Sequence, residues 1–575
     1  MASIVGKKIN GQTYYYLREM ARVGGKPKMV SERYLGKSAD IEAAMDGATS
    51  LPDRTRHLAF GDIAAAWSVI ERLRIAAITD EVVGTRRADA AASVGTYIAL
   101  ATLNRVCAPR SKLAFSTWWA TTAGDHLARL PASALDHRRF WDAMDAISAS
   151  QLVEIEARIV AVMVSSFDLD CSGLVLDMTN FATYIDSAND RAPIAQRGHA
   201  KQKRTDLRLV GLGLVVSTDG GIPLVSHTYA GNRPDVTQFP LMVDELVARF
   251  RALAGSDAEL TLVYDAGQDS EDNQEKVATS PLHFVGSLPP SDHPELLAVS
   301  ASHYRVVDEE AFPGLRAFET RKVALGAEYR LVVTHSRNLH DKQRRGFAQT
   351  VAKATGQLAE VQARLERGKT RKGRDAVEAE IAKILKPRWC ERVVTWSLVG
   401  ETPADFRLTF AVDEGAKVAL EEELFGKRVL FTDRDGWSIG AVVAAYRSQS
   451  GAESDFRQMK DPSVVGFSPM FHWTDAKIRV HTAYCVLALM VARLMVRDAK
   501  RAGAEMSVRA LLSSLAGIEE TVLIYPSTGG RPRARRMLTE MDPDQRRLYD
   551  LFGLDAYAPA RDVLGHTRGS RISAT

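Results

Sequence analysis

Three acidic residues that lie far apart in the chain have the spacing of a metal-dependent active site. Asp177 ends the apolar run 173–177, Asp265 ends the apolar run 260–265, and Glu453 follows the last predicted strand on a helix. Because ligands bind beyond the carboxyl ends of the strands in open α/β sheets, the pattern predicts that the three carboxylates converge there. Asp177 and Asp265 also suit a structural interpretation as turn or cap residues, and individually the two interpretations are about equal.

A second group of reactive side chains recurs at seven-residue intervals around Glu453. Tyr446, Glu453 and Lys460 would share one stripe of a helix, because seven residues make almost two turns, and Arg457 follows Glu453 at i+4. Such a stripe suits a metal-binding acid between groups that contact DNA phosphates. A solvated pair between Glu453 and Arg457 is the ordinary alternative.

A basic cluster precedes the apolar run that begins at Arg208. Lys201, Lys203 and Arg204 concentrate positive charge there. Contact with the DNA backbone and a plain solvated loop both fit this cluster.

The three acids predict a particular metal chemistry. Carboxylates without Cys or His partners favour a hard cation, Mg²⁺ or Mn²⁺, over zinc. Two such ions about 3.5–4 Å apart activate water and stabilise the leaving oxygen of a phosphodiester. The expected reaction is therefore cleavage of a nucleic-acid strand, and the freed 3′-hydroxyl can serve as the next nucleophile.

The elements that must position these residues indicate an α/β protein of several domains. Asp265 and Glu453 are 188 residues apart, whereas a βαβ unit needs only about 30 residues, so a whole domain must be inserted between them. The predicted segments are a β-hairpin region (1–59), a helical and possibly DNA-binding domain (60–166), the first part of a catalytic core (167–288), a β-rich insertion domain (289–436) with a helical hairpin (341–386), the last part of the core (437–500), and a C-terminal region with a tail (501–575).

Composition excludes some classes of protein. The 575 residues carry a net charge of +4 and are 46% hydrophobic, as in an ordinary globular chain. The four cysteines lack metal-site spacing, and the start of the chain lacks a secretory signal, so we expect a cytoplasmic protein. The most apolar run, 483–492, is too short for a membrane span and predicts a core helix, and we expect no membrane partner.

The motifs together resemble the DDE transposases of bacterial insertion sequences, in the branch with a Y-(2)-R-(3)-E-(6)-K signature. Tyr446, Glu453 and Lys460 occupy its positions, and Gln449 stands where the signature has arginine. The segments 177–180 and 265–273 resemble the blocks of the first and second acids, and 198–207 and 231–235 resemble blocks between them.

The resemblance implies the fold and the partners. It implies a ribonuclease-H-like mixed sheet flanked by helices and interrupted before the glutamate helix. It also implies double-stranded DNA partners (terminal inverted repeats and target DNA), a homodimer in the synaptic complex, and a bacterial cytoplasmic setting at the nucleoid.

Two other functions stay open from the sequence. One is a ribonuclease-H-like nuclease that cuts DNA without joining it. The other is a catalytically inactive DNA-binding descendant of such an enzyme, which the Gln449 departure favours.

Overall fold

The computed structural model describes residues 2–23, 26–49, 51–84, 91–201, 204–254, 259–368, 371–526 and 534–559. The chain divides into two compact units. The first unit combines Met1–Ser68, Ser116–Pro131 and Arg509–Thr575, and the second unit combines Val69–Phe115 and Ala132–Val508. Each unit thus draws on distant parts of the sequence, and the six segments predicted above stay predictions as domain boundaries.

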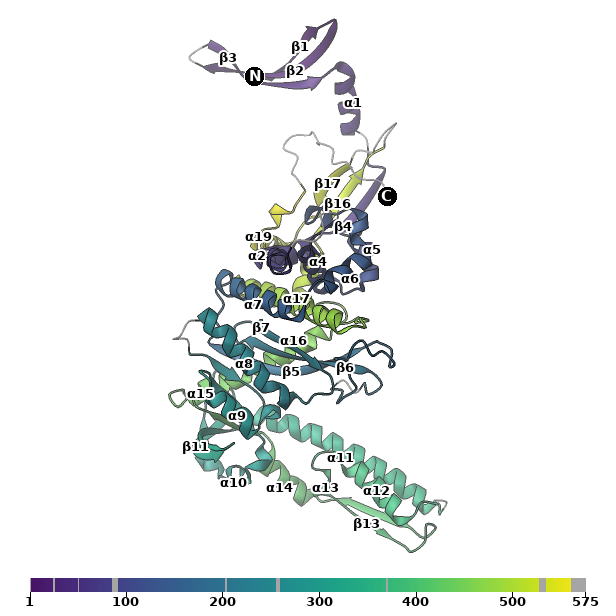
Figure 1. Ribbon diagram of the computed structural model, residues 1–575, viewed down its shortest axis with the longest axis vertical. Helices are drawn as coiled ribbons and strands as arrows, with labels where there is room; N and C mark the ends of the chain where they lie inside the picture. Colours follow the sequence, from purple (N-terminus) through teal and green to yellow (C-terminus); the bar gives the residue numbers. More distant parts are fainter. Residues whose placement is uncertain are drawn as a thin grey trace. The chain divides into compact units, whose positions relative to one another are not determined.

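The first unit begins with a three-stranded antiparallel sheet in the order β1-β2-β3 (Figure 1). The strands are β1 (Ala2–Ile9), β2 (Gln12–Val23) and β3 (Lys26–Gly36), and α1 (Ser38–Thr49) follows them. The predicted hairpin corresponds to β2 and β3, and β1 is an additional strand. Asn10 and Gly11 join β1 to β2 with positive φ angles of 49° and 78°, which a two-residue turn of this kind requires.

The first unit also contains a sheet that joins its two ends of sequence. β4 (Arg54–Ala59) pairs antiparallel with β16 (Glu519–Ile524), which pairs with β17 (Ala534–Leu538). Helix α19 (Pro543–Leu551) begins with an Asp542 capping box. The described part of the C-terminal region is therefore folded, with strands that the sequence pattern did not predict, and the predicted tail lies outside the described residues from 560 onward.

A nine-stranded mixed sheet forms the centre of the second unit (Figure 1). Its first five strands are β5 (Gly173–Thr183), β6 (Arg208–Ser217), β7 (Pro223–Ala230), β8 (Thr261–Val263) and β9 (His283–Leu288). They lie in the order β7-β6-β5-β8-β9, with β5, β8 and β9 parallel and β6 antiparallel to both neighbours. This is the ribonuclease-H-like arrangement, and the predicted mixed α/β fold is confirmed.

The sequence between the second and third acids extends the same sheet. β15 (Lys427–Thr432) pairs with β9, and β12 (Ala327–Ser336), β11 (Leu315–Ala324) and β10 (Arg305–Val306) follow outward. A helical hairpin of α11 (Arg337–Glu366) and α12 (Arg374–Leu385) lies beside the small hairpin of β13 (Val394–Val399) and β14 (Arg407–Val412) (Figure 1). The remaining helices here are α10 (Pro294–Leu297), α13 (Cys390–Val393) and α14 (Glu414–Leu424).

Helices cover both faces of the central strands. α8 (Asp235–Ala254) lies against β6 and β7, where Met242 contacts Gly213. α16 (Gln449–Met459) contacts β5, and α17 (Asp475–Arg501) contacts β7 and α16.

The remaining helices of the two units are α2 (Gly61–Arg72), α3 (Ile75–Val83), α4 (Val94–Cys107), α5 (Phe115–Trp119), α6 (His137–Asp145), α7 (Ala149–Ser166), α9 (Glu271–Ala278), α15 (Ile439–Arg447) and α18 (Val508–Ala516).

Helix α17 contains the apolar run that the sequence assigns to a core helix. It is the one helix in the described residues long and apolar enough to cross a membrane. Of its most apolar window, 83% is buried inside the protein. Besides β7 and α16, it contacts α4, α6 and α7 within the second unit, so it packs as a core helix.

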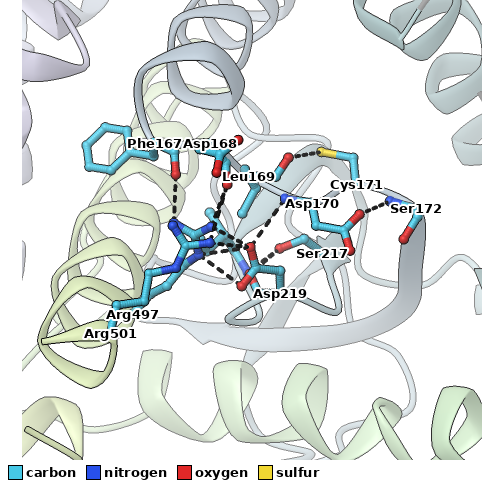
Figure 2. Close-up of polar contacts among 11 residues, drawn as sticks. Phe167, Asp168, Leu169, Asp170, Cys171, Ser172, Ser217, Asp219, Arg497 and Arg501 are labelled. Atoms are coloured by element: carbon cyan, nitrogen blue, oxygen red, sulfur yellow. Dashed lines mark hydrogen bonds and ion pairs between the residues drawn. The ribbon is translucent and has the colours of Figure 1, made fainter. Parts of the chain in front are cut away.

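A charged cluster ties α17 to the beginning of β5 (Figure 2). Arg497 donates hydrogen bonds to the carbonyl oxygens of Phe167 (2.8 Å) and Asp168 (2.7 Å) and to the carboxylate of Asp219. Asp219 lies in the turn between β6 and β7 and also accepts from the Asp170 N–H. One guanidinium thus fixes the chain that enters β5, the strand that carries the first acid.

Candidate active site

Asp177 and Asp265 occupy equivalent positions on two neighbouring parallel strands. β5 and β8 pair in the register Val175↔Val263, and each aspartate lies two residues further along its chain. The parallel register therefore brings both acids to the same end of the strand pair. The expectation that Asp177 ends its strand is wrong, because β5 continues to Thr183 by pairing with β6 over its whole length.

The odd-numbered residues of β5 face the helix that carries Glu453. Lys460 Nζ donates a hydrogen bond to Thr179 Oγ1 at 3.0 Å, and Phe181 stacks on Phe467 with ring centroids 4.1 Å apart. Met178, on the other face, lies near Gly213 beneath α8. Asp177 shares the face of Thr179 and Phe181, so it points toward the side of the sheet on which α16 lies.

The helix around Glu453 differs from the single stripe that the spacing predicts. α15 ends at Arg447 and α16 begins at Gln449, so Tyr446 and Glu453 lie on consecutive helices, and Lys460 caps the second. Ser448 at the junction bonds its hydroxyl to the Ala445 carbonyl, and Ser450 and Gly451 are weak helix formers. These residues favour a helix boundary near Ser448, and the predicted single helix is therefore divided there.

Buried contacts hold α16 against the rest of the second unit. Asp455 forms an ion pair with Arg493 of α17, and Phe456 and Met459 are buried. Burial raises the pKa of Asp455 to about 7, and Arg493 opposes the rise. Glu453 itself is exposed. The helix is thus anchored by one face while its glutamate stays accessible.

Asp265 is held by a short chain of hydroxyl groups. Its Oδ1 accepts from Ser287 Oγ of β9 at 3.2 Å and from the Tyr446 hydroxyl at 3.4 Å, and the Tyr446 hydroxyl lies 3.0 Å from Ser287 Oγ. Asp265 also accepts from the Ala266 N–H at the start of a short helical turn. Tyr446 therefore reaches the second acid directly, although it lies on a different helix from Glu453.

The charges of both other acids act on Asp177. Burial raises the pKa of Asp177 to about 6, and the charges of Asp265 and Glu453 add to the rise. The Met178 N–H and the charge of Lys201 act in the opposite direction. Like charges gathered in one place disfavour ionisation, which is the environment that a bound cation relieves.

Lys201 joins the site through a network with β5. Its Nζ donates to the Met178 carbonyl and to Asp235 Oδ2 (2.8 Å), and Asp235 also accepts from the Tyr229 hydroxyl at 2.7 Å. Asn180 bonds to the backbone of His199 and Lys201 and so holds this segment against β5. Lys201 and Lys460 both lie near Asp177, and the charge of Lys201 also acts on Lys460.

The other predicted DNA contacts are Arg204, Lys203 and Arg457. Arg204 forms a two-armed ion pair with Asp206, with hydrogen bonds of 2.9 and 2.7 Å. Lys203 lies outside the described residues. Arg457 is exposed on α16, and the described residues show no ion pair between it and Glu453. A role for these three in DNA binding stays a prediction.

The acids fit a divalent cation by the chemistry of their donors. Carboxylate oxygens are the ligands that Mg²⁺ and Mn²⁺ prefer, and Asp177 is a half-buried carboxylate on which two like charges act. In the part of the chain that the structure describes, no three His, Cys, Asp or Glu side chains are gathered closely enough to surround an ion. Enclosing an ion therefore requires the carboxylates to draw closer together.

Several residues at this site were not singled out from the sequence. Ser287 and Thr179 are the hydroxyls that contact Asp265 and Lys460, and Asp235 is the partner of Lys201. Asp269 is a fourth acid whose carboxylate oxygens, among the described residues, lack hydrogen-bond partners, and burial raises its pKa to about 8, with Asp265 and Asp292 adding to the rise. Its position four residues after Asp265 was the available signal.

Comparison with known proteins identifies the family. Residues 172–488 match the transposase DDE domain, a region that is more than half of the chain and contains Asp177, Asp265 and Glu453. No curated protein matches the chain. Among solved structures, the chain is similar to a piggyBac transposase synaptic complex with hairpin DNA, with a TM-score of 0.36 and 10% identity over 81% of this chain and 82% of that chain. The domain implies a nuclease or transposase enzyme that uses divalent metal ions. The chain belongs to the transposase DDE domain family.

Proposed function

We propose that this protein is a DNA transposase of the insertion-sequence kind, with Asp177, Asp265 and Glu453 as its metal-binding acids. It binds the terminal inverted repeats of its element, cleaves DNA strands by phosphodiester hydrolysis and joins the 3′ ends to target DNA. The match to the transposase DDE domain carries the proposal, and the parallel register that puts Asp177 and Asp265 at equivalent positions of β5 and β8 supports it. Burial raises the pKa of Asp177, and the charges of both other acids add to that rise.

The residues around the acids have distinct roles in this proposal. Asp177, Asp265 and Glu453 would hold a pair of Mg²⁺ or Mn²⁺ ions, which would supply activation of a water and stabilisation of the leaving oxygen of the scissile phosphodiester. Tyr446 and Ser287 orient the Asp265 carboxylate through the hydroxyl chain. Lys460 and Lys201 supply positive charge beside Asp177, where the negative phosphate must approach. Burial lowers the pKa of Lys460, and the charge of Lys201 adds to that effect while Asp177 opposes it.

A nicking assay tests the proposal. Supercoiled plasmid carrying the element's inverted repeats is incubated with the full chain and Mg²⁺, and the Asp177→Asn, Asp265→Asn and Glu453→Gln variants are compared with the wild type. We expect nicking by the wild type, no nicking with a chelator, and a loss of at least about 100-fold in each variant. Glu401→Gln, an exposed acid in a loop of the second unit, is the matched control and should retain full activity.

The two alternatives differ in what they predict for the same protein. A nuclease without joining activity nicks the plasmid but leaves pre-cleaved 3′ ends unjoined in a strand-transfer assay. An inactive descendant binds DNA with normal affinity and nicks nothing, and Gln449 at the signature's arginine position is the observation that favours it. Restoring Gln449→Arg distinguishes an inactive copy from a non-enzymatic fold, because only the former recovers nicking.

A further inference from the structure

The N-terminal sheet of the first unit is one of the positively charged segments of the chain. Residues 1–37 contain eight Lys and Arg against two Glu, a net charge of +6. The whole chain carries only +4, so the remaining residues are net negative by two charges. The small sheet is therefore positive for its size although the chain as a whole is nearly neutral, and it can attract a polyanion locally.

One face of this sheet is organised by contacts within the sheet itself. Lys7 and Arg18 both pair with Glu32 at 2.9 Å, and the Tyr16 ring lies 5.3 Å from the Tyr34 ring and 4.4 Å from Lys7 Nζ. The register Tyr16↔Tyr34 and Arg18↔Glu32 places these side chains on the same face. This face, which we call the tyrosine face, holds the three strands together through cross-strand pairs.

The opposite face presents four cations and one acid, Glu19, which lies across from Ser31. Lys8 lies across from Thr13, Lys28 from Ala21, Lys26 from Val23 and Arg33 from Leu17, which alternate with the residues of the tyrosine face. All four cations are exposed, and in the described residues none of them forms an ion pair or a hydrogen bond with another side chain. We call this surface, Lys8, Lys26, Lys28 and Arg33, the basic face.

We propose that the basic face binds the phosphate backbone of double-stranded DNA, as a contact additional to the DDE site. Three observations support it: the charge concentrated in this sheet, the lack of acidic partners for the four cations among the described residues, and the exposed apolar Ile4 (62% exposed) beside them. Antiparallel strands are an established means of following a DNA groove, and Lys and Arg supply the backbone contacts. The inference rests on the proposed function for its choice of DNA as the polyanion.

Salt-dependent binding of the full chain to duplex DNA tests this surface. The slope of log K against log salt becomes shallower by about 0.9 for each phosphate that the protein no longer neutralises. The Lys8→Gln/Lys26→Gln/Lys28→Gln/Arg33→Gln variant should therefore show a slope shallower by about 3–4 and at least about tenfold weaker binding at about 0.1 M salt. The charge-preserving variant Lys8→Arg/Lys26→Arg/Lys28→Arg/Arg33→Lys should bind as the wild type does.

A single pair of variants provides the control for position. Arg22 is exposed and lies on the tyrosine face, across from Pro27. Lys28→Gln should weaken DNA binding about two- to fivefold, whereas Arg22→Gln should change it by less than about twofold. Equal effects of the two substitutions would overturn the assignment of the basic face.

The outcomes also separate this inference from the proposed function. If the four-residue variant binds duplex DNA with an unchanged slope while Mg²⁺-dependent nicking persists, the basic face is wrong and the transposase stands. If binding falls as predicted but no variant or wild type nicks DNA, the basic face stands and the catalytic proposal fails. If the variant instead changes the oligomeric state in light scattering and leaves DNA binding unchanged, the surface contacts protein and the inference is overturned.

Discussion

Asp177 shows how a single residue can be placed for function at the expense of stability. Its carboxylate lies on a central strand, and burial together with two neighbouring acids raises its pKa to about 6. Between its ordinary pKa of about 3.9 and this value, the folded state binds more protons than the unfolded state, so stability falls as the pH rises. Above about pH 6 the charged carboxylate therefore destabilises the folded protein, and a bound cation would relieve that effect.

The first prediction follows from the destabilising charge of the Asp177 carboxylate. Without metal, Asp177→Asn should stabilise the protein at about pH 7.5 by roughly 1–3 kcal/mol, and the gain should shrink toward about pH 5. Thermal unfolding with a chelator over that pH range measures the effect. Mg²⁺ should raise the wild-type midpoint and leave that of the variant unchanged. An Asp177→Asn protein that is less stable than the wild type at the higher pH contradicts the argument.

The second prediction concerns the hydroxyl chain at Asp265. Tyr446→Phe removes the group that lies 3.0 Å from Ser287 Oγ and 3.4 Å from Asp265 Oδ1. Losing one orienting hydrogen bond should slow Mg²⁺-dependent nicking roughly 2–10-fold. Ser287→Ala should act on the same chain, so the double variant should be no slower than the worse single variant. Additive losses would show that the two hydroxyls act separately.

At the scale of elements, the cluster in Figure 2 links three parts of the second unit. Arg497 is only 4% exposed, and its partner Asp219 lies in a turn in which Gly220 and Gly221 have φ angles of 89° and 66°. These angles belong to the left-handed region that glycine adopts without strain. The turn thus delivers a carboxylate to a buried guanidinium at the point where β5 begins.

Removing the carboxylate gives the third prediction. Asp219→Ala leaves Arg497 buried without its counter-charge and should destabilise the protein by about 3–5 kcal/mol. Arg501→Gln is the control: this side chain is 51% exposed and lies 3.8 Å from Asp219, so its loss should cost less than about 1 kcal/mol. Denaturant midpoints of the two variants provide the measurement, and equal midpoints would argue against the cluster as an anchor.

The fourth prediction is that the same cluster makes the stability of the folded protein depend on pH in the acid range. Burial raises the pKa of Asp219, but hydrogen bonds from Arg497 and the Asp170 N–H outweigh it, and the net pKa lies below the ordinary value. A depressed pKa contributes stability above the unfolded value of about 3.9 that is lost as the pH falls through the folded value. The wild type should therefore lose stability below about pH 4, and Asp219→Asn should lose less over the same range. Denaturant unfolding of both proteins across that pH range measures the difference, and parallel losses would contradict it.

Local pattern predicts some of these elements and misses others for physical reasons. The runs at 173–177 and 260–265 identify β5 and β8, because buried parallel strands are continuously apolar. The extension of β5 to Thr183 depends on pairing with β6, and the pairing of β4 with β16 joins segments more than 450 residues apart. Neither the extension of β5 nor the pairing of β4 with β16 leaves a local signal in the sequence. The turn Asn10–Gly11 did leave one, since this dipeptide is typical of hairpins, and it marks the missed β1.

The sequence likewise predicts some residues of the candidate site and misses others. The sequence predicts Asp177, Asp265, Tyr446, Glu453 and Lys460 as one group. In the structure the Tyr446 hydroxyl contacts Asp265 and Lys460 contacts Thr179 on the strand of Asp177, and the grouping of all five stays a prediction. The supporting residues Ser287, Thr179 and Asp235 were missed because ordinary hydroxyl and acidic residues acquire a role only from their neighbours in space. The break at Ser448 was missed because the seven-residue spacing is compatible with either one helix or two.

At the scale of the whole molecule, the distribution of charge and the proposed reaction bear on assembly. Outside the N-terminal sheet the chain is slightly negative, so DNA must be held by local sites rather than by overall attraction. The proposed group of three acids suits one reacting DNA end at a time. We therefore expect two copies of the chain to act together when both ends of an element are joined to a target, and a closed pair with twofold symmetry is the simplest assembly.

The fifth prediction is the stoichiometry of the complex that the protein forms with DNA ends. Mixed with short duplexes of the inverted repeat and with Ca²⁺ in place of Mg²⁺ to prevent cleavage, the protein should form a particle of two chains and two duplexes. Light scattering and mass photometry measure the mass of this particle.

Asp177→Asn should assemble normally with Mg²⁺, because this substitution removes a metal ligand and leaves the DNA-binding surfaces intact. Strand transfer should appear only in fractions that contain the paired particle, since both 3′ ends must reach the target together. A single chain on a single duplex that carries out complete two-ended joining would contradict the paired assembly.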